Sequence, residues 1–147
     1  MTRVDFYLLP DVEAEAKLRF ACRIAHKAAL GGSRIHVHTG SEAQSRELDA
    51  VMWSYPADHF LPHEVVDADD TLVVKAPVSI GLADPQPAED EVLVNVADAI
   101  PEFFGRFERV VEIVLGPERE SGRDRYRHYR DRGYPLFHHE LDNWEER

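Results

Sequence analysis

Strand-like and helix-like segments alternate along the first half of the chain, and this alternation constrains the fold more than any other feature. Residues 4–9 and 34–39 predict strands, because apolar and aromatic residues are concentrated or regularly spaced there. An apolar stripe over residues 14–29, with Asp11 as the expected cap, predicts a helix between them. A capping-box pattern that begins at Ser41 predicts a second helix. Strands separated by helices favour parallel pairing with right-handed crossovers, so the predicted class is α/β.

The second half of the chain adds shorter strands to the same sheet. The expected strands cover residues 71–74, 78–82, 91–96, 107–115 and 134–139, and a short helical turn is expected over residues 101–104. We therefore predict a single domain with a mostly parallel mixed sheet flanked by helices, in a Rossmann-like topology. A chain of 147 residues buries about 70% of its unfolded surface, which is enough for a core without disulfides or metals.

The sequence lacks the motifs of a nucleotide-binding or hydrolytic enzyme. No Gly-x-Gly-x-x-Gly follows the first strand, and no Gly-Lys-Ser/Thr loop, Gly-x-Ser-x-Gly elbow or paired-cysteine zinc motif occurs. Cys22 lies within the apolar stripe of the first helix and is expected in the core. His36 and His38 share one strand face, but they have no third ligand at a recognisable spacing, so ordinary polar or half-buried histidines are expected. We expect no catalytic residue, no cofactor and no bound metal.

A helix near the carboxyl end carries the most distinctive side chains. At about 100° per residue, one arc about 100° wide holds Arg119, Arg123, Tyr126, Arg127 and Arg130. Arginine forms fork-shaped pairs with carboxylates and phosphates, so this basic face predicts a site for an anionic ligand. The alternative interpretation is a solvated helix whose arginines pair with acidic residues of the same helix.

The net charge narrows the choice of ligand. The chain carries a formal charge of −11 at pH 7, so its overall field repels duplex DNA and anionic membranes. A short acidic peptide fits better, because a few converging arginines can hold a few carboxylates. No apolar run approaches the roughly 20 residues that span a bilayer, and the amino end enters the first strand too early for a signal sequence. We expect a cytoplasmic protein.

An aromatic segment at residues 53–63 follows the second helix. Two prolines oppose regular structure there, while Trp53, Tyr55 and Phe60 supply large rings. These rings either cover the core at one edge of the sheet or form a docking patch for another protein, and the residues alone leave both alternatives open. Residues 64–70 are expected to form a solvated connection.

Several groups of residues, taken in order along the chain, resemble the chi subunit of the bacterial DNA polymerase III holoenzyme. The groups are Phe6-Tyr7-Leu8-Leu9; Leu48-Asp49-Ala50-Val51-Met52-Trp53 with Phe60-Leu61-Pro62-His63; Pro101-Glu102-Phe103-Phe104 with Phe107-Glu108-Arg109-Val110; and Arg123-Asp124-Arg125-Tyr126-Arg127-His128-Tyr129-Arg130 with Gly133-Tyr134. The resemblance covers residues 1–136 and leaves residues 137–147 as an acidic C-terminal tail. The chain departs from the family pattern in that tail and in the acidic loop at 84–91. The resemblance implies a non-catalytic α/β protein whose nucleotide-binding-like topology has lost the phosphate loop.

In that family, one surface binds the acidic carboxyl-terminal peptide of single-stranded DNA-binding protein. The resemblance implies that Arg123 and Tyr126 occupy peptide-binding positions and that Arg119 occupies a basic position. Arg127 and Arg130 join this predicted site on helix geometry alone. The implied role is an adaptor that links the coated single strand to the clamp loader.

A second family surface joins chi to the psi subunit of the clamp loader, or to a helicase-like protein that competes for the same place. Trp53 and Phe60 match the positions of this contact. The resemblance therefore favours the docking patch over the core cover for the aromatic segment.

Two other functions stay open at the level of sequence. A direct single-stranded DNA-binding protein would use the arginines with Tyr126, Tyr129 and Tyr134 as a stacking surface, although the negative net charge opposes this. A small α/β enzyme acting on nucleotides would need a phosphate cradle that the sequence lacks.

Overall fold

Seven strands form a single sheet in the order β3-β4-β2-β5-β6-β1-β7. The computed structural model describes residues 2–55, 61–66, 76–84 and 91–145. Its elements are β1 (Arg3–Leu8), α1 (Ala14–Leu30), β2 (Ile35–His38), α2 (Glu42–Ser54), β3 (His63–Val65), β4 (Val78–Gly81), β5 (Val92–Asn95), η2 (Glu102–Arg106), β6 (Arg109–Val114), η3 (Gly116–Glu118), α3 (Arg119–Asp131) and β7 (Leu136–Glu140). Each described pairing of neighbouring strands is parallel. The predicted α/β class is therefore confirmed.

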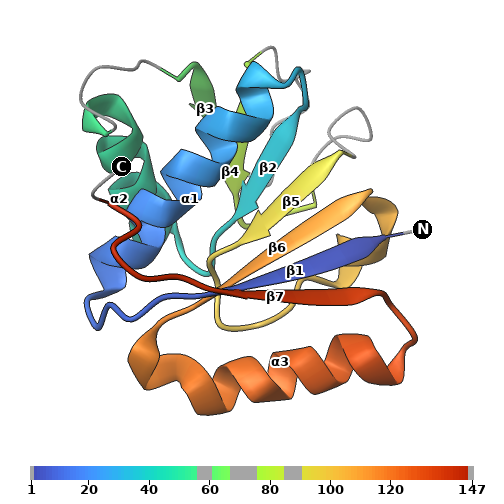
Figure 1. The fold of residues 1–147 in the computed structure, drawn as a ribbon. Coiled ribbons are helices and arrows are strands. Elements are labelled where there is room, and N and C mark those ends of the chain that lie inside the picture. Colours follow the sequence, from blue (N-terminus) through green and yellow to red (C-terminus); the bar gives the residue numbers. More distant parts are fainter. Residues whose placement is uncertain (1, 56–60, 67–75, 85–90, 146–147) are drawn as a thin grey trace.

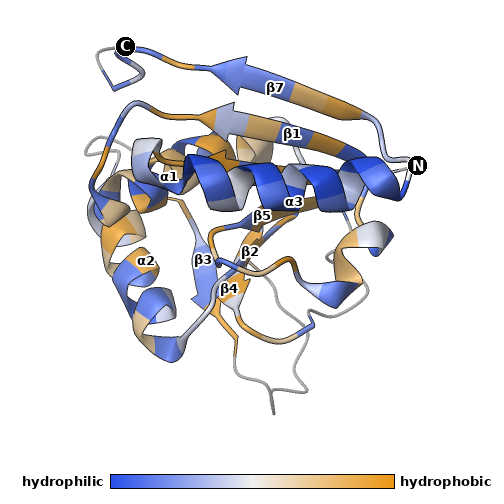
Figure 2. Cartoon of the chain, turned by 90° about the horizontal axis from the view of Figure 1, so that it is seen from below, coloured by the Kyte–Doolittle hydropathy of each residue, from blue (hydrophilic) through white to orange (hydrophobic). Residues whose placement is uncertain are grey.

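The sheet is the middle of three layers. Figure 1 shows α1 and α2 on one face of the sheet and α3 on the opposite face. The alternation of side chains along each strand supplies a separate core to each face: Phe6 and Val110 pack in the α3 core, whereas Val111 and Ile113 pack in the α1 core. Figure 2 shows that the side of α3 turned away from the sheet is strongly hydrophilic. A single helix thus covers one face while presenting a polar surface to solvent.

The helix starts follow the sequence prediction in α2 but not in α1. Ser41 caps α2 by accepting a hydrogen bond from the backbone N–H of Gln44, as the capping-box pattern predicts. Asp11 does not cap α1, because the residue before the helix is Glu13, without a side-chain cap bond. The Asp11 carboxylate instead accepts a hydrogen bond of 2.7 Å from the indole N–H of Trp144. An acidic residue near a helix start is thus used to hold a distant segment.

The chain beyond β7 returns across the α1 face. The backbone N–H of Leu141 donates to the carbonyl of Leu8, and the Trp144 ring is buried edge-on against Phe20 at a centroid distance of 5.2 Å. Trp144 is thus part of the α1 core.

Residues 63–65 form a strand that the sequence analysis did not predict. The expectation of a solvated connection over residues 64–70 is wrong for its first residues, because β3 pairs with β4 at the edge of the sheet. Three residues are too few to display a clear alternation, so the pairing depends on β4 and not on a local pattern. The strand predicted at 71–74 lies outside the described residues.

The buried thiol and the strand histidines agree with a structural role. Cys22 is fully buried, and burial raises the pKa of its thiol to about 12, so the prediction of a core cysteine is confirmed. Burial lowers the pKa of His36 to about 3, and its Nδ1 lies 2.7 Å from Ser79 Oγ. His38 is half-buried, and burial also lowers its pKa. Both rings are therefore neutral near pH 7.

The carboxyl ends of β1 and β6 meet where open α/β sheets commonly bind nucleotides, since α1 and α3 leave in opposite directions there. Two hydrogen bonds join the segments at this point. The Leu9 N–H donates to the Val114 carbonyl, and the Gly116 N–H donates to the Asp11 carbonyl. The buried ammonium of Lys17 lies 2.8 Å from Glu118 beside them. Backbone hydrogen bonds and one ion pair thus hold the chain together at this end of the sheet.

Candidate functional site

The two faces of α3 carry arginines in different environments. On the inner face, Gly122, Arg125 and Tyr129 are buried against the sheet. On the outer face, Arg119 and Arg123 are exposed. The helical period explains the separation, because Arg125 lies well outside the arc that holds the other arginines. The candidate site belongs to the outer face, while the inner face determines where the helix sits.

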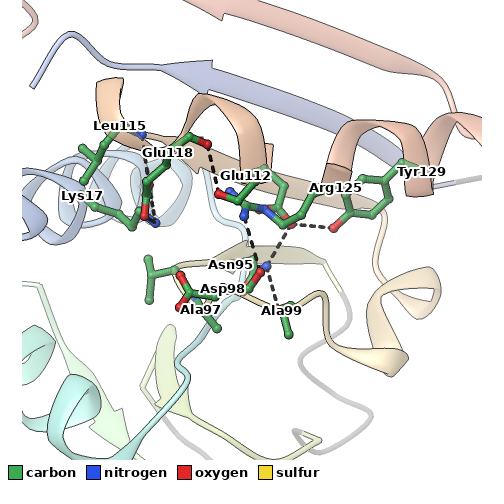
Figure 3. A network of polar contacts seen from close by, with 12 residues as sticks. Lys17, Asn95, Ala97, Asp98, Ala99, Glu112, Leu115, Glu118, Arg125 and Tyr129 are labelled. Carbon is green, nitrogen blue, oxygen red and sulfur yellow. Dashed lines mark hydrogen bonds and ion pairs between the residues drawn. The ribbon is translucent and has the colours of Figure 1, made fainter. Parts of the chain in front are cut away.

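A buried polar network fixes α3 to the sheet (Figure 3). Glu112, on β6, accepts hydrogen bonds of 2.9 Å from Arg125 Nε, 2.7 Å from the Tyr129 hydroxyl and 2.9 Å from the Asn95 amide. Burial raises the pKa of Glu112, and Arg125 with the other donors opposes that rise. Burial, and then the neighbouring Glu112, raise the pKa of the Tyr129 phenol. Such a network positions α3 at one height and rotation, because Arg125 and Tyr129 both lose Glu112 if the helix shifts.

Gly122 allows α3 to approach the sheet closely. A Cβ at this position would lie 2.9 Å from both methyl carbons of Val114 on β6. A larger residue would therefore push the helix away or displace Val114. Because Gly122 has no side chain, space remains between α3 and the sheet beside its contact with Val114.

That space is a pocket between α3 and the sheet, which we call the α3 pocket. It is lined by Phe6, Leu8, Val114, Arg119, Gly122, Arg123, Tyr126 and His138. Its volume is about 190 Å³, whereas pockets for drug-sized ligands measure roughly 300–1,000 Å³. The α3 pocket thus suits one side chain better than a nucleotide.

The pocket has an apolar floor and a cationic rim. Tyr126 is half-buried, and its ring packs edge-on against Phe6 at a centroid distance of 5.3 Å. Arg119 and Arg123 form the rim, and neither guanidinium makes an ion pair or hydrogen bond within the part of the chain that the structure describes. Within the described residues these two guanidiniums thus lack a carboxylate partner, although the net charge of the chain is −11. This arrangement can hold an apolar side chain and a carboxylate together.

Arg127 and Arg130 lie on the same exposed face but do not line the pocket. Arg127 pairs with Asp124 at 2.8 Å, and Arg130 pairs with Asp131 at 3.2 Å. These exposed pairs match the alternative interpretation of a solvated helix for this half of α3. The structure thus brings together Arg119, Arg123 and Tyr126, and leaves the other two predicted residues beside the pocket.

The second predicted surface surrounds Trp53 on α2, and we call the group of Trp53, His63 and Val65 the α2 surface. The Trp53 side chain is 62% exposed, and its ring packs edge-on against His63 at 5.2 Å. His63 is held in turn by Asp49 at 2.8 Å and by the Leu61 carbonyl at 2.7 Å. Trp53 therefore packs on a histidine that is held in place by hydrogen bonds, and its exposed ring does not cover the core. Phe60, the other predicted contact, lies outside the described residues.

The tyrosines do not form the stacking surface that a direct single-strand binder would need. Tyr129 is fully buried, and Tyr134 is half-buried against the α3 core. Of the three predicted stacking rings, Tyr126 alone borders the pocket. Over the described segments, no cluster of three or more metal-ligating residues occurs. In the same segments, no helix is both long and apolar enough to span a bilayer.

Sequence reasoning missed the floor and the far wall of the pocket. Phe6 and Leu8 share a strand face by simple alternation, but their position under α3 depends on the order of strands in the sheet. His138 comes from β7, whose placement beside β1 has no local signal. Gly122 was the one available signal, because glycine within a helix often marks a close approach.

Together, the fold and the pocket define a parallel α/β protein whose candidate site lies on a helix flank and not at the strand ends. The family described as DNA polymerase III chi subunit, HolC, matches residues 1–137. The DNA polymerase III subunit chi of Pseudomonas aeruginosa is 40% identical over 143 residues, which is 96% of this chain and 98% of that protein. The proteins of the same name from Escherichia coli K12 and Haemophilus influenzae are 27% and 25% identical, over 92% and 90% of this chain and 96% and 92% of those proteins.

The chain belongs to the DNA polymerase III chi subunit family, and the resemblance identified from its motifs is confirmed. Its role is that of a replication accessory protein, a subunit of the DNA polymerase III holoenzyme.

Proposed function

We propose that this protein is a non-catalytic adaptor that binds the acidic carboxyl-terminal peptide of single-stranded DNA-binding protein through the α3 pocket. The observation that carries the proposal is a pair of guanidiniums, Arg119 and Arg123, that have no partner among the described residues and border an apolar pocket sized for one side chain. A peptide that ends in an apolar residue and a free carboxylate, preceded by aspartates, matches both parts.

Each residue of the site has a distinct proposed role. Arg123 holds the terminal carboxylate, and Tyr126 with Phe6 forms the wall for the terminal ring. Arg119 neutralises the preceding aspartates at the rim. Arg127 and Arg130 add long-range attraction to the same exposed face, weakened by their own partners Asp124 and Asp131.

Fluorescence anisotropy with a labelled acidic peptide tests the site directly. We expect Arg123→Glu to abolish binding at low salt, because removing one arginine of a desolvated carboxylate pair costs roughly 2–5 kcal/mol. Arg46→Glu is the matched control, since Arg46 is exposed on α2 and undergoes the same charge change on the opposite face of the sheet. Unchanged binding by Arg123→Glu would eliminate this site.

A comparison of coated and bare DNA separates the proposal from its main alternative. An adaptor should bind an oligonucleotide only after single-stranded DNA-binding protein has covered it, whereas a direct binder should bind bare DNA with strong salt dependence. The burial of Tyr129 and the negative net charge support the adaptor. Tight, salt-sensitive binding to the bare strand would reverse the assignment.

We further propose that the α2 surface docks a clamp-loader component, either the psi subunit or a helicase-like competitor. An exposed tryptophan held by a supporting histidine suits a protein contact, because aromatic anchors dominate such interfaces. Trp53→Ala and Phe60→Ala should each remove the partner in co-purification. Leu30→Ala is the control, because Leu30 is 77% exposed at the end of α1 and outside this surface. Retention of every clamp-loader component by both variants would refute the docking role.

The same interpretation gives the protein no reaction of its own and a cytoplasmic location beside the replication machinery. The lack of phosphate-loop motifs in the sequence supports the first point, as do the hydrogen bonds at the strand ends where open α/β sheets commonly bind nucleotides. A screen that found nucleotide turnover dependent on Cys22 or a histidine would contradict it.

A further inference from the structure

The outer edge of β7 is an open strand edge directly beside the α3 pocket. β7 is the last strand in the sheet and pairs in parallel with β1 on one side. Figure 2 shows β7 along the border of the molecule, and none of the described segments lies beyond it. Each of its residues is half-buried or exposed, and none is fully buried. An open edge offers N–H and C=O groups that can pair with another extended chain.

The register determines which backbone groups of β7 are available. The N–H of Val4 donates to the Pro135 carbonyl, and the N–H of Leu141 donates to the Leu8 carbonyl. In a parallel ladder with Val4 opposite Leu136, the odd-numbered residues of β7 therefore pair with β1. Leu136, His138 and Glu140 direct their N–H and C=O groups away from the sheet, and these groups make no hydrogen bond within the described part of the chain.

One of these outward residues also belongs to the pocket. His138 pairs with Phe6, shares its sheet face and lines the α3 pocket together with Arg119 and Arg123. A strand added at this edge would continue directly from the pocket, and every second side chain would point to the α3 face. That face carries the arginines of the helix, so acidic side chains are favoured there.

We propose that the acidic peptide pairs with the outer edge of β7 as an eighth, parallel strand, and that its last residue fills the α3 pocket. This inference rests on the proposed function. α3 runs from the carboxyl ends of the strands back toward their amino ends, so Arg130 and Arg127 precede Arg123 and Arg119 along the direction of β7. A peptide parallel to β7 places its aspartates along these arginines and its carboxyl end at the pocket.

Backbone pairing explains recognition of a short, flexible peptide better than the pocket alone. A pocket for one side chain and two exposed arginines fixes only the last residue, whereas ladder hydrogen bonds orient the residues before it. Five residues of β7 span about 16 Å at roughly 3.3 Å per residue. The edge therefore accommodates an acidic segment of four to five residues.

A scan of singly N-methylated peptides tests the pairing, with anisotropy as the readout. N-methylation removes one donor, so methylation at residues that face β7 should weaken binding roughly tenfold, and methylation at the residues between them should change it little. This alternation with a period of two is the expected result. A scan without alternation, on a peptide that still binds, overturns the edge pairing and leaves the proposed function intact. Failure of the unmodified peptide to bind overturns both.

A matched pair of variants tests the same edge from the protein side. His138→Ala and His138→Pro both remove the imidazole, but only the proline removes the outward N–H. Proline is tolerated at an outward position of an edge strand, so the fold should be retained, as checked by circular dichroism. We expect His138→Pro to bind at least fivefold more weakly than His138→Ala. Equal affinities would overturn the proposal, as would sedimentation showing that a second copy of the chain occupies this edge.

Discussion

The inner and outer faces of α3 use the same residue type for opposite purposes. On the inner face, Arg125 is buried and bonded to Glu112, so its charge is compensated within the protein. On the outer face, Arg119 and Arg123 are exposed and have no carboxylate within the described residues. The contrast teaches that arginine content alone does not predict function, since the partner of each guanidinium decides whether it stabilises the fold or stays available to a ligand.

Removing the inner arginine should have the largest effect. Arg125→Ala leaves the Glu112 carboxylate buried without its cation, which should lower the free energy of unfolding by roughly 3–5 kcal/mol. Urea denaturation measures this change. Arg127→Ala is the control, because its exposed pair with Asp124 should contribute under about 1 kcal/mol. Similar stability losses in the two variants would show that the inner and outer arginines of α3 contribute equally to stability, which contradicts the contrast between the two faces.

The close approach at Gly122 gives the next largest effect. Gly122→Ala places a methyl group 2.9 Å from two Val114 carbons, and such overpacking typically costs about 1–3 kcal/mol of stability. Peptide affinity should fall as well, because both residues line the α3 pocket. The double variant Gly122→Ala with Val114→Ala should recover part of the stability, as thermal denaturation can show. An unchanged melting temperature for Gly122→Ala alone would contradict the contact.

A buried carboxylate on the opposite face of the sheet extends the comparison to pH. Burial alone would raise the pKa of Asp5, but hydrogen bonds from Arg3, His139 and Arg109 outweigh it and lower the pKa to about 2. A carboxyl group with a lowered folded-state pKa stabilises the protein above its unfolded pKa near 3.9. We expect about 2 kcal/mol of stability to disappear as the pH falls from about 4 to 2.

Asp5→Asn provides the reference for that pH effect. Its unfolding free energy should lack this loss between pH 4 and 2, although the variant is less stable at pH 7 because three donors lose their charged acceptor. Chemical denaturation across the acid range measures both slopes. Parallel curves for the two proteins would show that Asp5 is not the responsible group.

Removing the carboxylate that pairs with an outer arginine should have the smallest effect of these changes, and the effect should be on peptide affinity. Asp124→Ala removes the carboxylate that pairs with Arg127, so peptide affinity at low salt should rise about two- to fivefold and this gain should vanish as salt screens the charges. Glu47→Ala, exposed on α2, is the control for a change of the same charge away from the site. A gain that persists in high salt would indicate a contact other than the electrostatic one.

The sequence was sufficient for the layers of this fold but not for its polar contacts. Patterns within their own residues predict the strands β1 and β2 and the helices α1 and α2. The Ser41 cap of α2 follows in the same way. The bond between Arg125 and Glu112 joins residues of α3 and β6 whose meeting depends on the packed sheet. No local period distinguishes an arginine that will find a buried carboxylate from one that will not.

The sequence indicates only part of the candidate pocket for the same reason. The helical arc groups Arg119, Arg123 and Tyr126, and the structure places these three side chains at one pocket. The helical arc alone does not distinguish these three residues from Arg127 and Arg130. Side chains of β1, β6 and β7 form the rest of the pocket, and they determine which helix residues line it. His138 joins the site through parallel pairing with β1, which is a property of strand order.

The sheet separates the two surfaces, with α2 on one side and α3 on the other (Figure 1). The contacts proposed at Trp53 and at Arg123 therefore lie on opposite faces of the sheet, so each proposed partner could dissociate and rebind while the other stays attached. For a chain with this geometry, the two binding constants should be independent. When both partners belong to one assembly, binding of the first raises the effective concentration of the second at this chain to roughly the millimolar range. Two weak contacts can then keep a moving assembly on its template.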